Sequence, residues 1–587
     1  MPRACYKLAR LVVLAPILLI AGCQAYAAHI ILPRHGVRPA EYAVRVAHNV
    51  AMTTSDGVQL VADVYHPVTE QRVPTILVRL PYSKSLKTDL GLAVIGKFWA
   101  SRGYHVVVQA SRGMHGSGGT FYPLRDERRD GIETLQWLAQ QSWYDGRLGM
   151  WGGSAFGYTQ WAVADQKDPG PSALMIQIAS SHFHDMFYPG GAFSLESALY
   201  WALRSRGPHD DKPSDAMLDR GVNGFPLIKA DDRAANDIAF FNDWASHPDN
   251  DAYWQSIDGE QRARELRAPV LLMAGWSDPF LASQLRDFET LRASADPRVA
   301  SESRLIIGPW SHAESMRFPE GKSGDAYRPA SLAPSIPWFD HQLLGRPLDR
   351  SMAAPVKLFV MGENVWRDEQ EWPLARARPT KFFMRGGGHA NTANGDGRLS
   401  LDPPTDNEQP DTFAYDPRNP VPTRGGAMLS SRAGMQEQGD VERRQDVLVY
   451  STDPLTVDLE VTGPLSASLS VSTSAVSTDF TVKLVDVQPD GKAYNVSDGI
   501  LRRAYPRADG TDGAAQTITI ELWPTSMLFR RGHRIRIEVS SSNFPRYDRN
   551  ANTGKEPATD DAPVTANQVV YHSSMQLSSI LLPVVPR

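Results

Sequence analysis

The amino-acid sequence predicts an α/β domain that is interrupted by a helical insertion and followed by an all-β domain. Over residues 45–182, short β-branched runs alternate with helical patterns, which is typical of parallel strands joined by crossover helices. Over 183–262 this alternation stops, and Pro, Gly, Asp and aromatic residues are scattered among helical segments. It returns over 263–352, whereas 355–587 alternates apolar and polar residues as half-buried strands do.

The composition is that of a globular protein without a nucleic-acid partner. The chain has 587 residues, 42% of them apolar and 22% charged, and this length suits about two to four domains. A net charge of −5 without any basic block gives no electrostatic basis for binding nucleic acid, so that class of protein is excluded. We expect no cofactor, and the sequence leaves the oligomeric state open, a homo-oligomer included.

Residues 1–22 have the pattern of a secretory signal peptide, because basic residues precede an apolar run that is too short to span a bilayer. Ile-Ala-Gly-Cys at 20–23 resembles a bacterial lipobox, in which Cys23 is the lipid acceptor. Ala-Tyr-Ala at 25–27 fits ordinary cleavage and is the alternative. We favour the lipobox and expect an exported, periplasmic or outer-membrane-anchored bacterial lipoprotein. Cys5 is the other cysteine, so the exported domains contain no internal disulfide.

The first α/β part, 45–182, contains segments of clear type. The apolar runs 74–80 and 104–110 are expected to be buried strands, and 146–152 and 173–180 are expected to be the next two. Within 130–140, apolar residues recur at a spacing of three, which predicts one face of a helix. These apolar positions are expected to form the core.

Residues 183–262 form the predicted helical cap, in which 194–205 has the clearest helical pattern. The runs 268–278 and 303–313 then predict strands that resume the interrupted sheet. An insertion at the carboxyl edge of such a sheet would cover any site built there.

The C-terminal part is expected to be a two-sheet sandwich or jelly roll. Residues 457–461 alternate apolar and polar side chains, which places Val457 on the same face as Val461. A second run covers 465–471, beyond Gly463 and Pro464. The alternation recurs later in the domain.

Three residues of suitable chemistry follow predicted strands. Ser154 lies in GMWGGSAFGYTQW (149–161), between a strand-like and a helix-like segment, and Asp278 and His312 each end an apolar run. Acyl transfer needs a nucleophile, a base and a carboxylate that orients the base, and α/β-hydrolases carry them in the order Ser, Asp or Glu, His. Singly, these residues suggest a tight turn, a helix cap and an ordinary histidine. Their joint occurrence in this order predicts a catalytic triad.

Two hydrogen-bond donors are candidates for an oxyanion hole. The backbone N–H of Ala155 directly follows the nucleophile, and Tyr82 follows the strand 74–80 at the loop where these folds place the second donor. The alternative role of Tyr82 is that of an aromatic side chain packing beside Pro81.

Two patterns resemble metal sites, but we expect no metal. His182, His184 and Asp185 lack a defined further ligand. The run DRNANTG from Asp548 spaces oxygen ligands like a calcium loop, but its glycine and its twelfth position, Thr559, do not fit.

These residues lie in segments that resemble, in order, the cocaine esterase/X-Pro dipeptidyl-peptidase family of serine hydrolases, which also includes α-amino-acid ester hydrolases. The segments span most of the chain after the signal peptide. They are DGVQLVADVYHP (56–67), LPYSK (80–84), SRGMHGSGGTF (111–121), YDGRLGMWGGSAFGYTQW (144–161), YPGGAF (188–193), GWSD (275–278), GPWSH (308–312), VMGENVWRDEQEWP (360–373) and NFPRYDRNANTG (543–554).

The resemblance implies an α/β-hydrolase fold with a helical cap and a C-terminal jelly roll of the galactose-binding-like kind. It gives the roles of nucleophile, acid and base to Ser154, Asp278 and His312, and that of an oxyanion-hole hydroxyl to Tyr82. It also implies that Phe280, two residues after the acid, lines an acyl pocket.

Trp151 and Trp276 are further candidates for that pocket. The serine segment follows the family's G-x-S-x-x-G form, in which Gly152 serves the sharp turn. Gly157 is expected to let the following helix pack closely against a neighbouring strand.

The expected function is cleavage of a small acyl ester or amide, or of a short peptide, through an acyl-enzyme. X-Pro dipeptidyl-peptidase and α-amino-acid ester hydrolase are alternatives, but both must hold a substrate amine, and the residues after Asp278 are apolar. Asp185 and Glu196 are candidate anchors whose simpler interpretation is solvated or structural charge. A surface- or carbohydrate-binding protein with a vestigial hydrolase domain is the non-enzymatic alternative. Contact with a membrane is expected only through a lipid anchor at Cys23.

Overall fold

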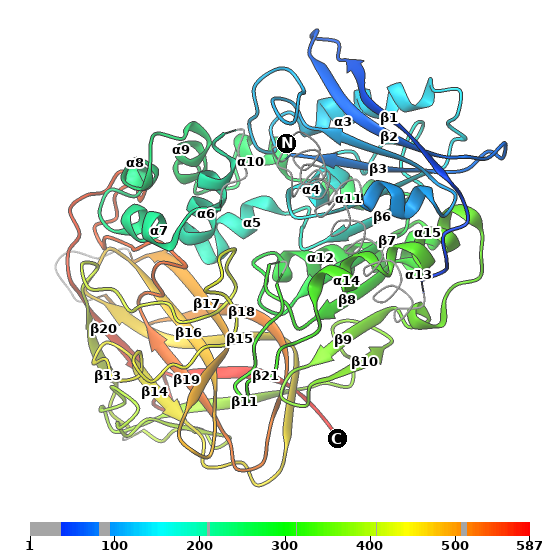
Figure 1. Ribbon diagram of the computed structural model, residues 1–587. Helices are drawn as coiled ribbons and strands as arrows, with labels where there is room; N and C mark the ends of the chain where they lie inside the picture. Colours follow the sequence, from blue (N-terminus) through cyan, green and yellow to red (C-terminus); the bar gives the residue numbers. More distant parts are fainter. Residues whose placement is uncertain (1–36, 82–93, 208–211, 313, 407, 506–512) are drawn as a thin grey trace, which may run out of the picture.

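A computed structural model describes residues 37–81, 94–207, 212–312, 314–406, 408–505 and 513–587 (Figure 1). The segment predicted to be a signal peptide, with Cys23, lies outside the described residues, as does Tyr82, so what the sequence predicts for them stays a prediction. Across these ranges, no helix has the length and apolar character needed to cross a bilayer.

The first sheet has ten strands in the order β1-β2-β4-β3-β5-β6-β7-β8-β9-β10. Strands β3 to β9 pair in parallel, while β1 and β2 at one edge and β10 at the other are antiparallel. The α/β class is confirmed. The strands are β1 (Val44–Thr53), β2 (Gln59–Pro67), β3 (Thr75–Leu80), β4 (His105–Ala110), β5 (Leu148–Gly153), β6 (Ala173–Gln177), β7 (Val270–Gly275), β8 (Arg304–Gly308), β9 (Val356–Val360) and β10 (Val365–Glu369).

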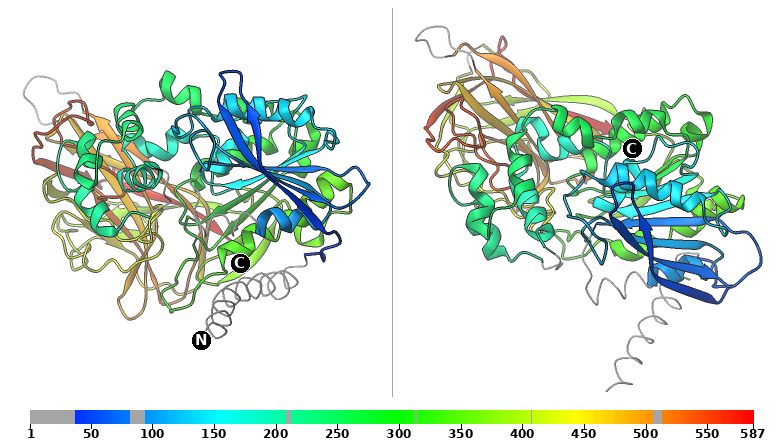
Figure 2. Two further views of the ribbon diagram at one scale, coloured as in Figure 1. Left: turned by 45° about the horizontal axis from the view of Figure 1, so that its top comes forward. Right: turned by 90° about the horizontal axis from the view of Figure 1, so that it is seen from above.

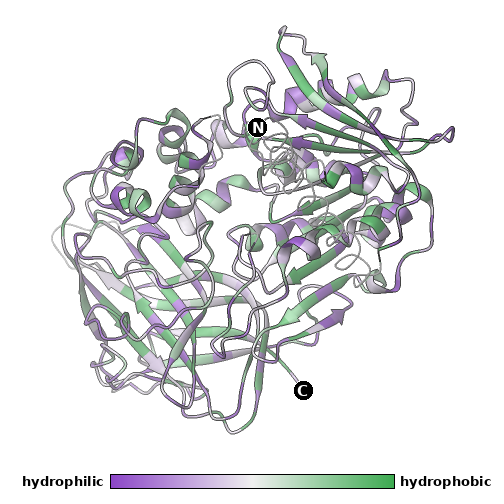
Figure 3. Cartoon of the chain, viewed as in Figure 1, coloured by the Kyte–Doolittle hydropathy of each residue, from purple (hydrophilic) through white to green (hydrophobic). Residues whose placement is uncertain are grey.

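Helices cover both faces of this sheet, which explains why its central strands are continuous apolar runs (Figures 2 and 3). Leu77 packs into one core cluster, whereas its neighbours Ile76 and Val78 pack into the other, as the two-residue period of a strand requires. The helices outside the cap are α3 (Glu127–Ala139), α4 (Ala155–Trp161), α12 (Leu281–Arg292), α13 (Pro297–Glu302), α14 (Tyr327–Leu332) and α15 (Ser335–Leu344).

The helical cap follows β6 and precedes β7. Its core is aromatic: Trp201 stacks on Trp244 with ring centroids 4.9 Å apart, and Phe187 packs against Trp244 at 4.8 Å. The cap helices are α5 (Phe183–Phe187), α6 (Leu195–Ser205), α7 (Asp215–Val222), α8 (Ala230–Ala234), α9 (Ala239–Ser246), α10 (Ala252–Ile257) and α11 (Glu260–Glu265).

The C-terminal domain is all-β, as predicted, and lies beside both the cap and the first sheet (Figure 1). Its strand order is β13-β20-β15-β21-β11-β12-β14-β19-β16-β17, and β18 pairs with β15. The strands are β11 (Arg378–Arg385), β12 (Arg398–Ser400), β13 (Asp411–Tyr415), β14 (Leu448–Ser451), β15 (Leu459–Thr473), β16 (Ser477–Val487), β17 (Ala493–Ala504), β18 (Gln516–Phe529), β19 (Arg534–Ser540), β20 (Ala566–Tyr571) and β21 (Ser579–Val585).

Three details differ from the sequence-based expectations. Val457 lies before β15 and is exposed, whereas Val461 is fully buried, so the expected shared face is wrong for Val457. The strand β15 also continues through Gly463, where its register shifts, instead of dividing into two strands. Strands β9 and β10 lie within the range 355–587 predicted for the all-β domain, yet they extend the first sheet.

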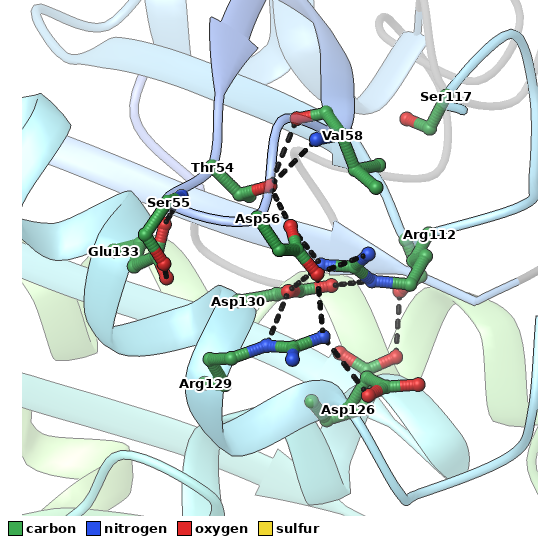
Figure 4. Close-up of polar contacts among 12 residues, drawn as sticks. Thr54, Ser55, Asp56, Val58, Arg112, Ser117, Asp126, Arg129, Asp130 and Glu133 are labelled. Atoms are coloured by element: carbon green, nitrogen blue, oxygen red, sulfur yellow. Dashed lines mark hydrogen bonds and ion pairs between the residues drawn. The ribbon is translucent and has the colours of Figure 1, made fainter. Parts of the chain in front are cut away.

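Arg112 ties together three parts of the α/β domain (Figure 4). Its guanidinium donates to both carboxylate oxygens of Asp130 in α3, at 3.0 and 2.6 Å, and to Asp56 at 2.9 Å. Asp56 lies in the turn between β1 and β2 and accepts the Thr54 hydroxyl at 2.5 Å. The hydrogen bonds from Thr54 and then Arg112 hold the pKa of the Asp56 carboxyl well below its ordinary value. The segments 56–67 and 111–121 are therefore joined by one charge network.

Candidate active site

Ser154, Asp278 and His312 meet at the carboxyl edge of the first sheet. They follow β5, β7 and β8, and they form one hydrogen-bonded chain. His312 Nε2 lies 2.9 Å from Ser154 Oγ, and His312 Nδ1 lies 2.6 Å from Asp278 Oδ2. This is the geometry in which a histidine can take a proton from a serine while a carboxylate holds its other ring nitrogen.

Ser154 occupies a strained turn between β5 and α4. Its backbone angles, a φ of 57° and a ψ of −131°, are ones that residues other than glycine rarely adopt. A Cβ atom at Gly152 would lie 2.3 Å from the carbonyl oxygen of Phe156, and one at Gly157 would lie 2.6 Å from Ala179 Cβ. Both glycines are therefore required by close approach. The Cβ at residue 157 would also lie 3.3 Å from the Gln177 carbonyl oxygen in β6, so the expected close packing of this helix against a neighbouring strand is present, with the closest contact at Ala179 just after that strand.

The loops that carry Asp278 and His312 are joined through Trp310. A Cβ atom at Gly275 would lie 2.4 Å from the Trp310 carbonyl oxygen, and one at Gly308 would lie 2.2 Å from the Trp310 ring. The Ser277 N–H donates to that same carbonyl at 3.0 Å. The glycines of GWSD and GPWSH therefore make room for a fully buried indole that fixes one loop against the other.

Asp278 is held on both sides of its carboxylate. It is fully buried, its Oδ1 accepts the Phe280 N–H at 2.8 Å, and its Oδ2 faces His312. Phe280 lies between the rings of Phe183 and His312, with centroid distances of 5.4 and 5.9 Å. The imidazole thus packs on an apolar support.

Ala155 is the first residue of α4, where backbone N–H groups have no partner within the helix. Its N–H is available as one oxyanion donor next to Ser154. The second predicted donor, Tyr82, follows Pro81 outside the described residues.

A cavity of about 430 Å³ opens over Ser154 and His312. All three parts of the chain contribute to its wall: the α/β domain, the cap helix α6 and the C-terminal domain. Its described lining includes Leu80, Trp151, Phe156, Gln177, Tyr200, Trp201, Arg204, Tyr327, Arg328, Leu429, Ser430 and Ser431.

Of the three predicted pocket residues, the structure places only Trp151 in the described lining. Phe280 packs beneath His312 instead. Trp276 points into the core, where its Nε1–H donates to the Phe359 carbonyl at 2.7 Å. The expectation that these two side chains line the acyl pocket is therefore corrected.

Several wall residues were missed by sequence reasoning. Tyr200 and Trp201 lie in the aromatic helical run 194–205, which was a usable signal. Residues 429–431 carried no signal in the sequence, because they reach the cavity from the C-terminal domain, which is distant along the chain.

Neither predicted amine anchor lines the cavity. Asp185 pairs with Arg286, and Glu196 is fully buried, where burial raises the pKa of its carboxyl to about 7. Among the described lining residues, carboxylates come from Asp215 and Glu314, and both side chains are exposed.

Across the described ranges, no group of three or more His, Cys, Asp or Glu side chains is arranged to hold a metal ion. The calcium-like run has other contacts: Asp548 accepts the Phe193 N–H at 2.9 Å, and Asn550 donates to Asp479 at 2.8 Å.

The chain matches two family models. The X-Pro dipeptidyl-peptidase (S15 family) model covers residues 56–314, and the X-Pro dipeptidyl-peptidase C-terminal non-catalytic domain model covers residues 352–581. The chain is also 37% identical over 596 residues to the cocaine esterase of Rhodococcus sp. (strain MB1 Bresler), which covers 92% of this chain and 99% of that protein. A putative serine esterase of Mycobacterium bovis is 24% identical over 640 residues, covering 91% of this chain and 94% of the relative.

Two solved structures have the same fold along nearly their whole length. An aminopeptidase from the marine sediment archaeon Thaumarchaeota archaeon has a TM-score of 0.77 at 24% identity, covering 93% of this chain and 97% of that one. An α-amino acid ester hydrolase has a TM-score of 0.74 at 24% identity, with the same coverage of 93% and 97%. Both family domains in order, together with a relative aligned over almost its full length, show that the chain belongs to the X-Pro dipeptidyl-peptidase (S15) family of α/β-hydrolases.

Proposed function

We propose that the protein is an exported serine hydrolase that cleaves small acyl esters or amides through an acyl-enzyme. The observation that carries the proposal is the hydrogen-bonded chain from Asp278 through His312 to Ser154, which ends at a cavity of about 430 Å³.

In the acylation step, His312 Nε2 takes the proton of Ser154 as Oγ attacks the substrate carbonyl carbon. Asp278 holds the protonated imidazole in its orientation and stabilises its charge. The oxyanion that forms is bound by the Ala155 N–H and by the Tyr82 hydroxyl, and these donors act most strongly where charge develops. His312 then gives its proton to the leaving group, whose bond to the carbonyl carbon breaks.

Deacylation repeats these roles with water. His312 takes a proton from the water as it attacks the acyl-enzyme carbonyl, and then returns the proton to Ser154 Oγ as the acid leaves. The imidazole thus acts as base and acid in each half of the reaction.

The lining of the cavity favours an apolar acyl group. Trp151, Phe156, Tyr200, Trp201 and Leu429 present aromatic and aliphatic surface beside the nucleophile. A dipeptidyl-peptidase or an amino-acid ester hydrolase would have to hold an ammonium group, but the carboxylates in the described lining are exposed to solvent, where ion pairs contribute little. We therefore rank an esterase or amidase above those two activities.

The test is a substrate screen with the mature protein, using aryl esters, amino-acid esters and Ala-Pro anilide. The Ser154→Ala variant should lose several orders of magnitude in kcat for every substrate that the wild type cleaves. Normal turnover by a folded Ser154→Ala protein would refute the mechanism. If a fluorophosphonate fails to label Ser154 in the folded wild type, the proposed hydrolase function is replaced by the alternative of a surface- or carbohydrate-binding protein with a vestigial hydrolase domain.

The proposed export rests on residues 1–22 and the lipobox. Lipid attachment at Cys23 would place the wild type in the detergent phase of a two-phase extraction and Cys23→Ala in the aqueous phase. Recovery of the wild type in the aqueous phase, with cleavage after Ala27, would favour soluble release.

A further inference from the structure

The C-terminal domain contacts the backbone of the proposed catalytic acid. The indole Nε1–H of Trp523, in β18, donates to the carbonyl oxygen of Asp278 at 3.0 Å. We propose that Trp523 is a positioning residue that holds Asp278 in register with His312. The inference rests on the proposed function, because it concerns the same triad.

The contact completes the fixation of the Asp278 backbone. The same carbonyl oxygen accepts the Leu281 N–H at 3.1 Å, and the Asp278 N–H donates to the Gly275 carbonyl at 3.1 Å. A carbonyl oxygen has two lone pairs, and here each has a donor. Because only one methylene carbon separates the carboxylate from Cα, a small backbone movement changes its 2.6 Å contact with His312.

Trp523 is itself held by residues of its own domain. The guanidinium carbon of Arg546 lies 4.6 Å from the centroid of the indole ring, and Arg546 forms an ion pair with Asp498. The Ser497 hydroxyl donates to the Trp523 carbonyl at 2.5 Å. Both Arg546 and Asp498 are buried, so their pairing is a fixed support for the ring.

Arg546, which supports the Trp523 ring, lies in a sequence segment that contains none of the three triad residues. Arg546 belongs to NFPRYDRNANTG (543–554), and Asn543 of the same segment donates to Asp498 at 3.0 Å. The segment thus braces the arginine that stacks on Trp523, and its effect reaches the active site through one indole hydrogen bond.

Trp523 is well placed for a chemical test. It is half-buried and lines a second cavity of about 220 Å³, together with Pro279, Ala282 and Arg286. This second cavity shares no described lining residue with the cavity over Ser154. A ligand bound where the indole stood can therefore restore the contact without occupying the substrate site.

The first experiment replaces the donor but keeps an aromatic ring. In the full-length mature protein, Trp523→Phe should lower kcat for an aryl ester by about 3- to 10-fold, the range for one net hydrogen bond. KM should stay near the wild-type value, because Trp523 is outside the described substrate cavity. The matched control is Trp338→Phe, which removes an indole hydrogen bond of the same length, 3.0 Å, to the Leu174 carbonyl in the α/β core. It should lower thermal stability but leave kcat unchanged.

The second experiment separates the hydrogen bond from packing. Trp523→Ala should lose more activity than Trp523→Phe, and added indole should restore part of its kcat. Benzofuran has the same shape but no N–H, and it should not restore kcat. Restoration by benzofuran as well as by indole would overturn the proposal, since the role of Trp523 would then be packing.

A wild-type kcat in Trp523→Phe would also overturn the proposal, and this measurement decides alone if neither heterocycle restores Trp523→Ala. Ser154→Ala, measured in parallel, distinguishes a failure of the proposed function from a failure of the proposed role of Trp523. If Ser154→Ala retains turnover, the proposed function fails. If Ser154→Ala is inactive while Trp523→Phe is fully active, only the role of Trp523 fails.

Discussion

The close contact at Gly157 leads to a prediction about the nucleophile. A methyl group on residue 157 would place its carbon 2.6 Å from Ala179 Cβ, whereas carbon atoms in contact prefer a separation of about 3.5–4.0 Å. The helix α4 must therefore move by about 1 Å in the Gly157→Ala variant. Because α4 begins at Ala155, this movement displaces Ser154, whose Oγ lies 2.9 Å from His312 Nε2.

Two effects of different size should follow in Gly157→Ala. Overpacking a core by one methyl group costs about 1–3 kcal/mol of the free energy of unfolding. A displacement of about 1 Å at the reacting atoms costs about 10²-fold in rate. We therefore expect a folded protein whose kcat/KM for an aryl ester is about 10²-fold lower, with slower fluorophosphonate labelling of Ser154.

The second-site variant Ala179→Gly gives the sharpest test of this explanation. It removes the atom that the new methyl group meets, and the next nearest atom is the Gln177 carbonyl oxygen at 3.3 Å. The double variant should recover most of the lost kcat/KM. Gly118→Ala is the control, because its Cβ would meet its nearest atom at 3.6 Å, an ordinary contact. The reasoning is refuted if Gly157→Ala keeps wild-type kcat/KM, or if Ala179→Gly restores none of the loss.

Two further predictions concern the oxyanion hole and a buried carboxyl group. Tyr82→Phe should lower kcat by about 10²-fold or more, the scale of one oxyanion donor; an unchanged kcat would leave Tyr82 as a packing residue beside Pro81. Burial raises the pKa of the Glu196 carboxyl from 4.5 to about 7, so its ionisation opposes folding. The stability of the folded protein is therefore highest below pH 4.5, the pKa in the unfolded chain, and it falls as the pH rises through about 7, the pKa in the folded protein. Glu196→Gln should therefore be more stable than wild type by up to about 3 kcal/mol at about pH 8, with no such gain at about pH 4. Denaturant unfolding at the two pH values measures the difference, and an equal gain at both would contradict the assignment.

The elements and the close approach of Ser154, Asp278 and His312 could be predicted because their signals are local. The strands β3 and β4 are buried at every position, so they appear in the sequence as unbroken apolar runs. The carboxyl ends of parallel strands meet at one edge, so residues that directly follow β5, β7 and β8 must lie near one another. The positions of Ser154, Asp278 and His312 after these strands were therefore enough to predict that the three residues lie close together.

The wall of the cavity could not be predicted in the same way. Phe280 and Trp276 are apolar residues beside Asp278, and a sequence does not distinguish an apolar side chain that lines a cavity from one that fills the core. Ser430 reaches the cavity only because the C-terminal domain packs against the cap, and no local pattern encodes that contact. Val457 follows the alternation of its neighbours, but it lies before the strand begins.

The cap packs closely against the C-terminal domain beside the candidate active site. A Cβ atom at Gly190 would lie 1.9 Å from the Ile500 carbonyl oxygen, so YPGGAF fits against β17 only with glycine there. The Glu196 N–H, in the next cap helix, donates to the Pro545 carbonyl at 3.0 Å.

These contacts fix the helix that carries Tyr200 and Trp201 relative to the domain that carries Ser430 and Trp523. The C-terminal domain matches a family model described as non-catalytic, and it supplies none of the three triad side chains. It nevertheless completes the wall of the cavity over Ser154 and donates a hydrogen bond to the backbone of Asp278, the proposed catalytic acid. The α/β domain supplies Ser154, Asp278 and His312 at its sheet edge, and the C-terminal domain supplies that part of the wall and that hydrogen bond.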